Sequence, residues 1–124
     1  MDAAQALADL TEISSQIEAA VLFSADGSVA GSTLADDARA QSLAGAALEI
    51  LEAAGGESVA QVEASTREGA VFVVRDGERG IVAVTSVDPT VGLVFYDLKS
   101  CLRNAGDEKP KRRRRPAAKE DGDA

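Results

Sequence analysis

The chain of 124 residues has no histidine, no tryptophan and one cysteine, Cys101, and only 3% of its residues are aromatic. Without histidine it lacks the commonest general base, the commonest metal ligand and every Ser-His or Cys-His dyad. A lone cysteine forms neither an intramolecular disulfide nor a zinc site. No apolar run approaches the roughly 18 residues that span a bilayer, and the N-terminus lacks a signal pattern. These absences predict a cytoplasmic protein that is not an enzyme and carries no cofactor or metal.

The remaining residues that could carry chemistry have structural explanations. No GxxxxGK[ST] loop and no GxGxxG after a strand is present to cradle a nucleotide phosphate. Asp36 and Asp37 are adjacent acids at the start of a predicted helix, where the helix dipole favours negative charge. Asp26 and Asp76 are interpreted as turn residues, and Cys101 lies on an apolar stripe that predicts a buried, inert thiol.

Charge is distributed unevenly along the chain, whose net charge is −8. Residues 1–106 contain 16 acidic and 6 basic residues, a net charge of −10, whereas residues 107–124 contain 5 acidic and 7 basic residues, a net charge of +2. The second segment has no β-branched or large apolar residue and is predicted to be disordered. The sequence therefore predicts one acidic domain, 1–106, followed by a basic and acidic tail, 107–124.

Hydrophobic periodicity predicts three helices and five strands. In chain order they are a helix at 2–17, strands at 19–24 and 29–33, a helix at 35–54, strands at 59–66, 70–74 and 81–87, and a helix at 90–104. An Asp26-Gly27 turn joins the first two strands, and Gly55-Gly56 ends the second helix. Asp88 is predicted to cap the last helix, with Pro89 in its first turn.

Two elements carry unusual patterns. In the second helix the predicted core stripe consists of Leu43, Ala46, Ala47, Ile50, Leu51 and Ala54. Ala44 and Leu48 widen this apolar arc to about half the circumference, more than the ~100° that one core requires. Either alanine tolerates exposure there, or the helix is buried on two sides. Strand 59–66 is only intermittently apolar, whereas the two strands that follow are almost wholly apolar, which predicts that 59–66 lies at a sheet edge.

The order of the elements, together with the strings VLFSADGSVAGST and VTSVDPTVGLVFYDLKSCL, resembles the Roadblock/LC7 family over roughly residues 4–105. The resemblance implies an α/β (α+β) sandwich of profilin-like topology with a five-stranded antiparallel sheet of order 2-1-5-4-3. The first and last helices would cover one face and the second helix the other. Compact length and alanine-rich composition are more similar to the prokaryotic, Mgl-type members.

The resemblance also implies function. Members of this family usually form homodimers through their third strands and second helices, and act as non-catalytic platforms, activators or scaffolds for small Ras-like GTPases. In this chain the implied dimer interface comprises Val59, Gln61, Val62, Glu63, Ala44, Leu48 and Leu51. Arg39, Arg67, Arg75 and Arg79 could each be proposed as an inserted arginine finger, but surface solvation explains them, and none is assigned this role.

The basic run in the tail comprises Lys109, Lys111, Arg112, Arg113, Arg114 and Arg115. It is suited to an anionic membrane surface or an acidic protein patch, or it only solubilises the chain. No recognition helix or aromatic residue accompanies it, which argues against specific DNA binding. Two further hypotheses stand beside the GTPase regulator: an adaptor in a signalling or localisation complex tethered by this tail, and a small-molecule sensor, which would need a cavity.

Overall fold

The computed structural model describes residues 2–56 and 59–106. Its elements are α1 (Ala3–Ile13), β1 (Ile17–Ser24), β2 (Val29–Ser32), α2 (Asp37–Ala54), β3 (Gln61–Ser65), β4 (Ala70–Asp76), β5 (Arg79–Thr85) and α3 (Val91–Gly106). The predicted order of elements is confirmed. The basic run of the tail lies outside the described residues, so its predicted contacts and the domain boundary at residue 106 remain predictions.

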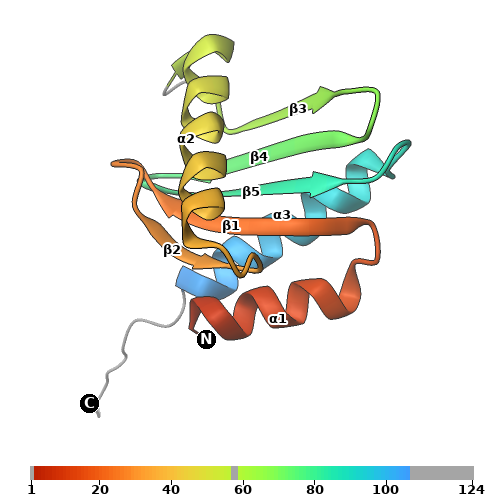
Figure 1. Ribbon diagram of the computed structural model, residues 1–124, viewed down its shortest axis with the longest axis horizontal. Helices are drawn as coiled ribbons and strands as arrows, with labels where there is room; N and C mark the ends of the chain where they lie inside the picture. The colour runs from red at the N-terminus through yellow and green to blue at the C-terminus, as the bar shows by residue number, and fades with distance from the viewer. Residues whose placement is uncertain (1, 57–58, 107–124) are drawn as a thin grey trace, which may run out of the picture.

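The five strands form one antiparallel sheet with the order β2-β1-β5-β4-β3, as predicted (Figure 1). The three most apolar strands, β1, β5 and β4, are adjacent and lie inside the sheet. β2 and β3 are the edges, which agrees with their mixed polarity. The sheet therefore places its least apolar strands where one side of each backbone meets solvent.

Helices cover both faces of the sheet and define two cores. α1 and α3 pack on one face, where Leu10, Leu22, Phe72 and Leu98 belong to one buried cluster. α2 crosses the other face over Val21, Val73 and Val82 (Figure 1). Alternate residues of each strand point to opposite faces, so one apolar strand serves both clusters. This explains why the inner strands are apolar throughout rather than alternating.

The first helix is shorter than predicted. α1 ends at Ile13, and Ser14 has extended backbone angles (φ −121°, ψ 98°). Ile17, which was predicted to continue the helical stripe, is the first residue of β1 and pairs with Thr85. The prediction was wrong because two backbone paths place Leu10 and Ile17 in the same core. One is a continuous helix, and the other is a helix that ends at Ile13 and is followed by a strand.

The start of the last helix also differs from the prediction. α3 begins at Val91 rather than 90, so Pro89 precedes the helix and does not lie in its first turn. Asp88 has a φ of 58°, in the left-handed region, and belongs to the connection after β5. Thr90, which directly precedes α3, accepts the hydrogen bond from the Val94 N–H. The predicted cap at Asp88 is therefore wrong, because the connection between β5 and α3 is two residues longer than expected.

The buried stripe of α2 is rotated from the predicted one. Its buried residues are Ala40, Ala44, Ala47 and Leu51. Of the predicted core stripe, Leu43 and Ile50 are only half-buried, and Ala46 and Ala54 are exposed. Small alanines let the helix approach the sheet closely, so the large side chains on its flank spread sideways over the strands. Hydrophobicity alone could not find this rotation, because it ranks leucine above alanine as a core residue.

Candidate functional site: the β3 edge and the flank of α2

β3 is an edge strand that pairs with β4 alone within the described chain. Its exposure alternates along the strand: Gln61, Glu63 and Ser65 are exposed, and Val62 and Ala64 are half-buried. The other edge strand, β2, is only four residues long, is interrupted by a register shift and is contacted by α1. β3 is thus the more regular of the two edges, and its unpaired backbone groups can add a further strand.

An apolar row crosses the sheet beside α2 without being covered by it. Ala19, Val84, Val71 and Ala64 are in register across β1, β5, β4 and β3, and all four are half-buried. The next row on the same face, Val21, Val82, Val73 and Val62, lies under the helix, and its first three members are fully buried. The uncovered row therefore extends the apolar face as far as the β3 edge.

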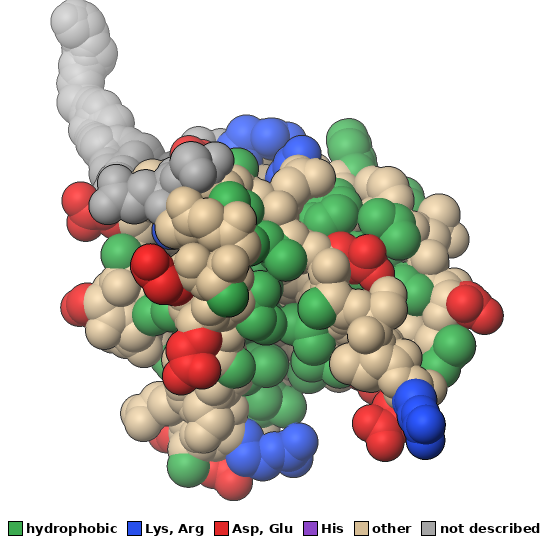
Figure 2. Space-filling view, turned by 90° about the horizontal axis from the view of Figure 1, so that it is seen from above, with side chains coloured by type: hydrophobic (Ala, Val, Ile, Leu, Met, Phe, Trp, Pro, Cys, Tyr) green, Lys and Arg blue, Asp and Glu red, His purple; other side chains and the backbone are tan. Residues whose placement is uncertain are grey.

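The flank of α2 next to this row forms the wall of a groove. The volume of this groove is about 610 Å³. The residues that line it include Leu43 and Ala46 of α2 and Ala19 and Val84 of the sheet. Seen from the side where β3 lies, hydrophobic side chains gather in a hollow between two rims that carry acidic side chains (Figure 2). We call Leu43, Ile50 and the row Ala19–Val84–Val71–Ala64 the α2 groove. The hollow itself lies over β1 and β5, where Glu18, Arg39 and Ser42 also line it, and the uncovered row continues from Val84 to Ala64 of β3.

The structure places the residues predicted for a dimer interface in different environments. Val59 and Val62 are half-buried at or near the β3 edge, and Gln61 and Glu63 are exposed there. Ala44 and Leu51 are already buried under α2, with exposed fractions of 0% and 1%. Leu48 lies on the opposite flank of α2 from the groove, 3.8 Å from the point where a Cβ on Gly27 would be. The predicted interface residues from strand 59–66 are therefore grouped at one sheet edge, whereas those from α2 do not share an exposed surface.

Sequence reasoning missed the residues of the α2 groove. Leu43 and Ile50 were assigned to the core, and Val71 and Val84 to plain core strands. The four-residue row depends on strand register, which brings together residues up to 65 positions apart. The signal that could have found it is the alternation within β4 and β5, where every second residue faces α2, and a helix of 18 residues crosses only part of that face.

Arg75 fixes the connection that leads into β3. Its Nη2 donates hydrogen bonds to the carbonyl oxygens of Gly56 and Val59, the latter at 2.9 Å, and its backbone N–H donates to Ala60 at 2.7 Å. The guanidinium thus satisfies carbonyls that follow the end of α2, a position where a cation is favourable. Arg39 and Arg67 are exposed. Arg75 therefore positions the edge strand rather than projecting from it.

Two acidic residues singled out in the sequence, Asp26 and Asp36, have structural roles in a turn and at a helix start. The Asp26 carboxylate accepts hydrogen bonds from the Ser28 N–H at 2.9 Å and from the Ser28 hydroxyl at 2.7 Å. Both bonds lower the pKa of Asp26, and the bond from the backbone N–H has the larger effect. Asp36 caps α2 by accepting from the Ala38 N–H at 2.9 Å. Residues 2–56 and 59–106 contain no group of three acidic, cysteine or histidine side chains that could hold a metal ion. No helix in these ranges is long and apolar enough to cross a membrane.

Comparison with solved structures identifies the fold. A Roadblock/LC7 domain from Streptomyces avermitilis superposes with a TM-score of 0.73 and 17% identity, covering 86% of this chain and 97% of that one. The gliding protein MglB from Thermus thermophilus superposes with a TM-score of 0.63 and 17% identity, covering 85% and 86%. An MglB described as having a tetrameric arrangement gives 0.59 and 17%, covering 83% and 86%. No family sequence model and no curated protein sequence matches the chain.

These superpositions confirm the fold expected from the sequence. The chain has an α+β fold with a five-stranded antiparallel sheet and three helices. It is the Roadblock/LC7 fold, in the form also seen in MglB.

Proposed function

We propose that the chain is a non-catalytic module that forms a homodimer and regulates or scaffolds a small Ras-like GTPase. The observation that carries the proposal is the combination of the β3 edge, which pairs only with β4 among the described strands, with the uncovered apolar row that leads to it from the hollow beside α2. Two copies related by a twofold axis through β3 would join their sheets and bring a second α2 beside the first. An isologous contact of this kind uses the same surface on both copies.

The groove supplies what strand pairing alone lacks. Backbone bonds along a five-residue strand give direction but little apolar burial. Leu43, Ile50 and Val71 are half-buried in the single chain, so a neighbouring helix would remove further apolar area from water. The interface that we propose therefore keeps Val59, Gln61, Val62 and Glu63 from the dimer interface expected from the sequence. It replaces Leu48 by Leu43 and Ile50 on the side of α2 that faces the groove.

The GTPase part of the proposal rests on the fold and on the functions that the Roadblock/LC7 resemblance implies. A twofold dimer offers a continuous sheet as a platform, and a regulator needs no catalytic residue if the GTPase supplies its own. Stabilising one arrangement of the GTPase switch segments would be sufficient to change hydrolysis or placement.

Sedimentation equilibrium of the full chain tests the dimer. We expect a dimer that is weakened about tenfold or more by Val62→Asp and by Ile50→Asp, since each places a charge in an apolar interface. Ala8→Asp on the exposed side of α1 adds the same charge away from the interface and is expected to leave association unchanged. Circular dichroism establishes that the variants are folded. A wild-type chain that stays monomeric at about 100 μM, or an equal effect of Ala8→Asp, would refute the interface.

Binding to a panel of small Ras-like GTPases from the same genome tests the partner. Each GTPase is loaded with GDP or with a non-hydrolysable GTP analogue, and binding and hydrolysis are measured with the wild type and with Val62→Asp. We expect one GTPase to bind in a nucleotide-dependent way and the monomeric variant to bind it more weakly. If the dimer forms but no GTPase binds in either state, the GTPase part is wrong and the dimer stands.

A second candidate function is an adaptor in a signalling or localisation complex, favoured by the opposite charges of domain and tail. The run from Lys109 to Arg115 would tether the chain to an anionic membrane surface or an acidic protein. Removing residues 107–124 separates the two functions. Loss of localisation with intact GTPase regulation supports the adaptor, whereas unchanged localisation contradicts it.

A further inference from the structure

Among the described residues, the large hydrophobic side chains that are exposed gather at one end of the molecule, where α1 ends and α3 begins. They are Ile13 (65% exposed), Val87 (55%), Val91 (40%), Leu93 (49%) and Tyr96 (66%). We call these five residues the α1/α3 patch. Single exposed hydrophobic residues are ordinary, but a group of them at one end of a molecule marks a binding surface.

The packing of α1 against α3 brings the patch together. The two helices are antiparallel: the Cys101 thiol donates to the Ala6 carbonyl at one end, and Gln16 accepts from the Thr90 N–H at the other. Cys101, Asp97 and Leu93 follow one another at four-residue spacing on α3, so Leu93 lies two turns from Cys101 on the side facing α1. Ile13 lies about two turns from Ala6 on α1. Ile13 and Leu93 therefore lie near the same end of the helix pair, where the end of α1 meets the start of α3.

Tyr96 extends this surface outward. It is three residues from Leu93, so the two side chains are neighbours on the helix surface. The core of α3 is formed by Val94, Leu98 and Leu102 on its other side. α1 lies along the β2 side of the sheet, at the far edge from β3 (Figure 1). The patch is consequently separate from the α2 groove and would stay exposed in the proposed dimer, once on each copy.

Most charged side chains around the patch are acidic; the exception on α3 is Lys99, three residues from Tyr96. Residues 2–38 contain no Lys or Arg, and Asp9 and Glu12 lie on the last turns of α1. Asp88 lies between Val87 and Val91, and Asp97 on α3 is buried. The basic residues of α3, Lys99 and Arg103, line a different hollow together with Gln61 and Val74. The patch is therefore apolar at its centre, and its border carries more acidic than basic side chains, with Glu12 and Asp88 on one side and Lys99 beside Tyr96.

We propose that the α1/α3 patch binds an amphipathic helix of a partner protein, with an apolar stripe and flanking lysine or arginine residues. The apolar stripe would cover Leu93, Tyr96 and Ile13, and the basic flanks would pair with Glu12 and Asp88. An anionic membrane would be repelled by these carboxylates. The chain's own tail carries the matching charge, but its apolar residues are only alanine and proline, so it would leave the hydrophobic centre uncovered. This proposal does not depend on the GTPase or on the dimer.

A synthetic peptide tests the chemistry of the site directly. The probe is a fluorescent 18-residue Leu/Lys peptide with its leucines on one helical stripe, titrated with the full chain and followed by anisotropy. We expect binding that is weakened about tenfold or more by the pair Leu93→Ser and Tyr96→Ser. Both side chains are exposed in the single chain, so the fold should persist. If the pair nevertheless unfolds the chain, Tyr96→Ser alone is used.

Matched variants separate this site from the general acidity of the domain. Glu12→Gln with Asp88→Asn should weaken binding and reduce its salt dependence, whereas Asp37→Asn with Glu49→Gln on α2, the same change in charge, should not. Equal weakening by the two pairs, or equal affinity of a Leu/Lys peptide whose stripe is scrambled, would overturn the proposal. A Leu/Glu peptide with the same stripe should bind more weakly, and if it binds as well, the proposal is overturned.

Two other occupants would also show themselves. If a second copy covers the patch, Leu93→Ser with Tyr96→Ser will change the sedimentation of the chain alone. If the tail covers it, the peptide will bind only after residues 107–124 are removed. Either result, or no binding of the Leu/Lys peptide below about 100 μM, overturns the proposal.

Discussion

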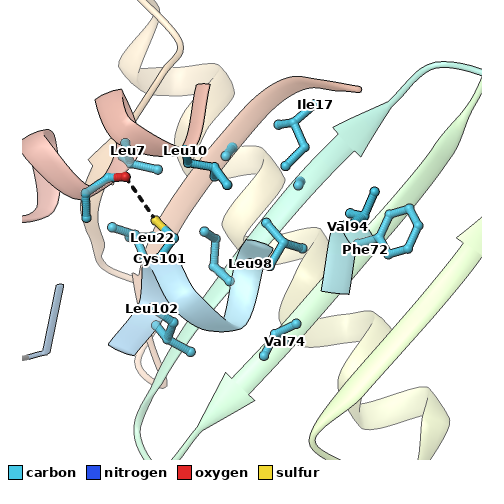
Figure 3. Close-up of a cluster of buried hydrophobic side chains, with 14 of the residues drawn as sticks. Leu7, Leu10, Ile17, Leu22, Phe72, Val74, Val94, Leu98, Cys101 and Leu102 are labelled. Carbon is cyan, nitrogen blue, oxygen red and sulfur yellow. Dashed lines mark hydrogen bonds between the residues drawn. The ribbon is translucent and has the colours of Figure 1, made fainter. Parts of the chain in front are cut away.

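The thiol of Cys101 donates a hydrogen bond to the backbone carbonyl of Ala6 at 3.4 Å, joining α3 to α1 across 95 residues of sequence (Figure 3). The sulfur lies among Leu7, Leu22 and Leu102 in the core between the sheet and these two helices. Because the thiol is the donor, this contact forms only while Cys101 is protonated.

Cys101 should therefore react slowly, and it should become reactive only at a higher pH than an exposed thiol. Burial, aided by the negative charge of Asp9, raises the pKa of Cys101 to about 11. We expect slow reaction with an aromatic disulfide reagent at pH 8 and full reactivity in denaturant, since the thiolate is the nucleophile. Stopped-flow absorbance measures both rates. Comparable rates with and without denaturant would show that the thiol is accessible.

The raised pKa of Cys101 also predicts how the free energy of unfolding changes with pH. The thiol of the unfolded chain loses its proton near its ordinary pKa, below 11, while the folded chain keeps it. The unfolded state then binds fewer protons, so the free energy of unfolding should fall as pH rises through this interval. Urea titrations at several pH values measure this slope. Cys101→Ala should make the slope shallower, and an unchanged slope would assign it to other groups.

Gly69 should not tolerate any side chain. A Cβ on this residue would lie 2.0 Å from the Thr85 carbonyl oxygen, at the point where β4 begins beside the end of β5. Gly69→Ala must therefore move backbone, and we expect a loss of about 2 kcal/mol or more in the free energy of unfolding. Gly45→Ala in α2 is the control, because nothing lies within 4 Å of its Cβ position. It should stabilise the chain by up to about 1 kcal/mol. Equal effects of the two substitutions would contradict the close approach.

The aromatic pair under α3 should contribute measurably to the core. Phe95 meets Phe72 edge to face, with ring centroids 5.0 Å apart and an interplanar angle of 76°. Phe95→Leu keeps an apolar side chain but loses this geometry, and we expect it to cost about 1 kcal/mol. The next residue, Tyr96, is 66% exposed, so Tyr96→Leu should change the free energy of unfolding by less than about 0.5 kcal/mol. Chemical denaturation compares the two, and a larger effect at Tyr96 would mean that the patch is already covered.

Arg75 should control the entry into the edge strand. Arg75→Met keeps much of the aliphatic stem but removes the donors to the Gly56 and Val59 carbonyls. We expect faster hydrogen exchange at Val59 and Ala60 and weaker dimerisation, because the β3 edge loses its anchor. Arg67→Met on the exposed β3–β4 turn is the matched control and should change neither. If Arg75→Met changes exchange but not association, the anchor does not support the interface.

Much of this fold follows from local patterns. The Asp26-Gly27 turn, the cap at Asp36 and the stop at Gly55 depend on hydrogen bonds and backbone angles within a few residues. The predictions failed where the chain leaves a helix while its hydrophobic spacing continues, as at Ile17, or where a turn takes up extra residues, as at Asp88. In both places two backbone paths satisfy the same pattern.

The sequence by itself determined the kinds of elements, their order and the half-polar edge strand. Only the tertiary structure decided which apolar residues remain uncovered. Leu43 and Ile50 lie on the flank of α2 because alanines face the sheet, and Ile13 and Leu93 lie at the same end of the molecule because α1 and α3 are antiparallel. Hydrophobicity is a property of each residue, whereas burial depends on what the remaining chain places beside it.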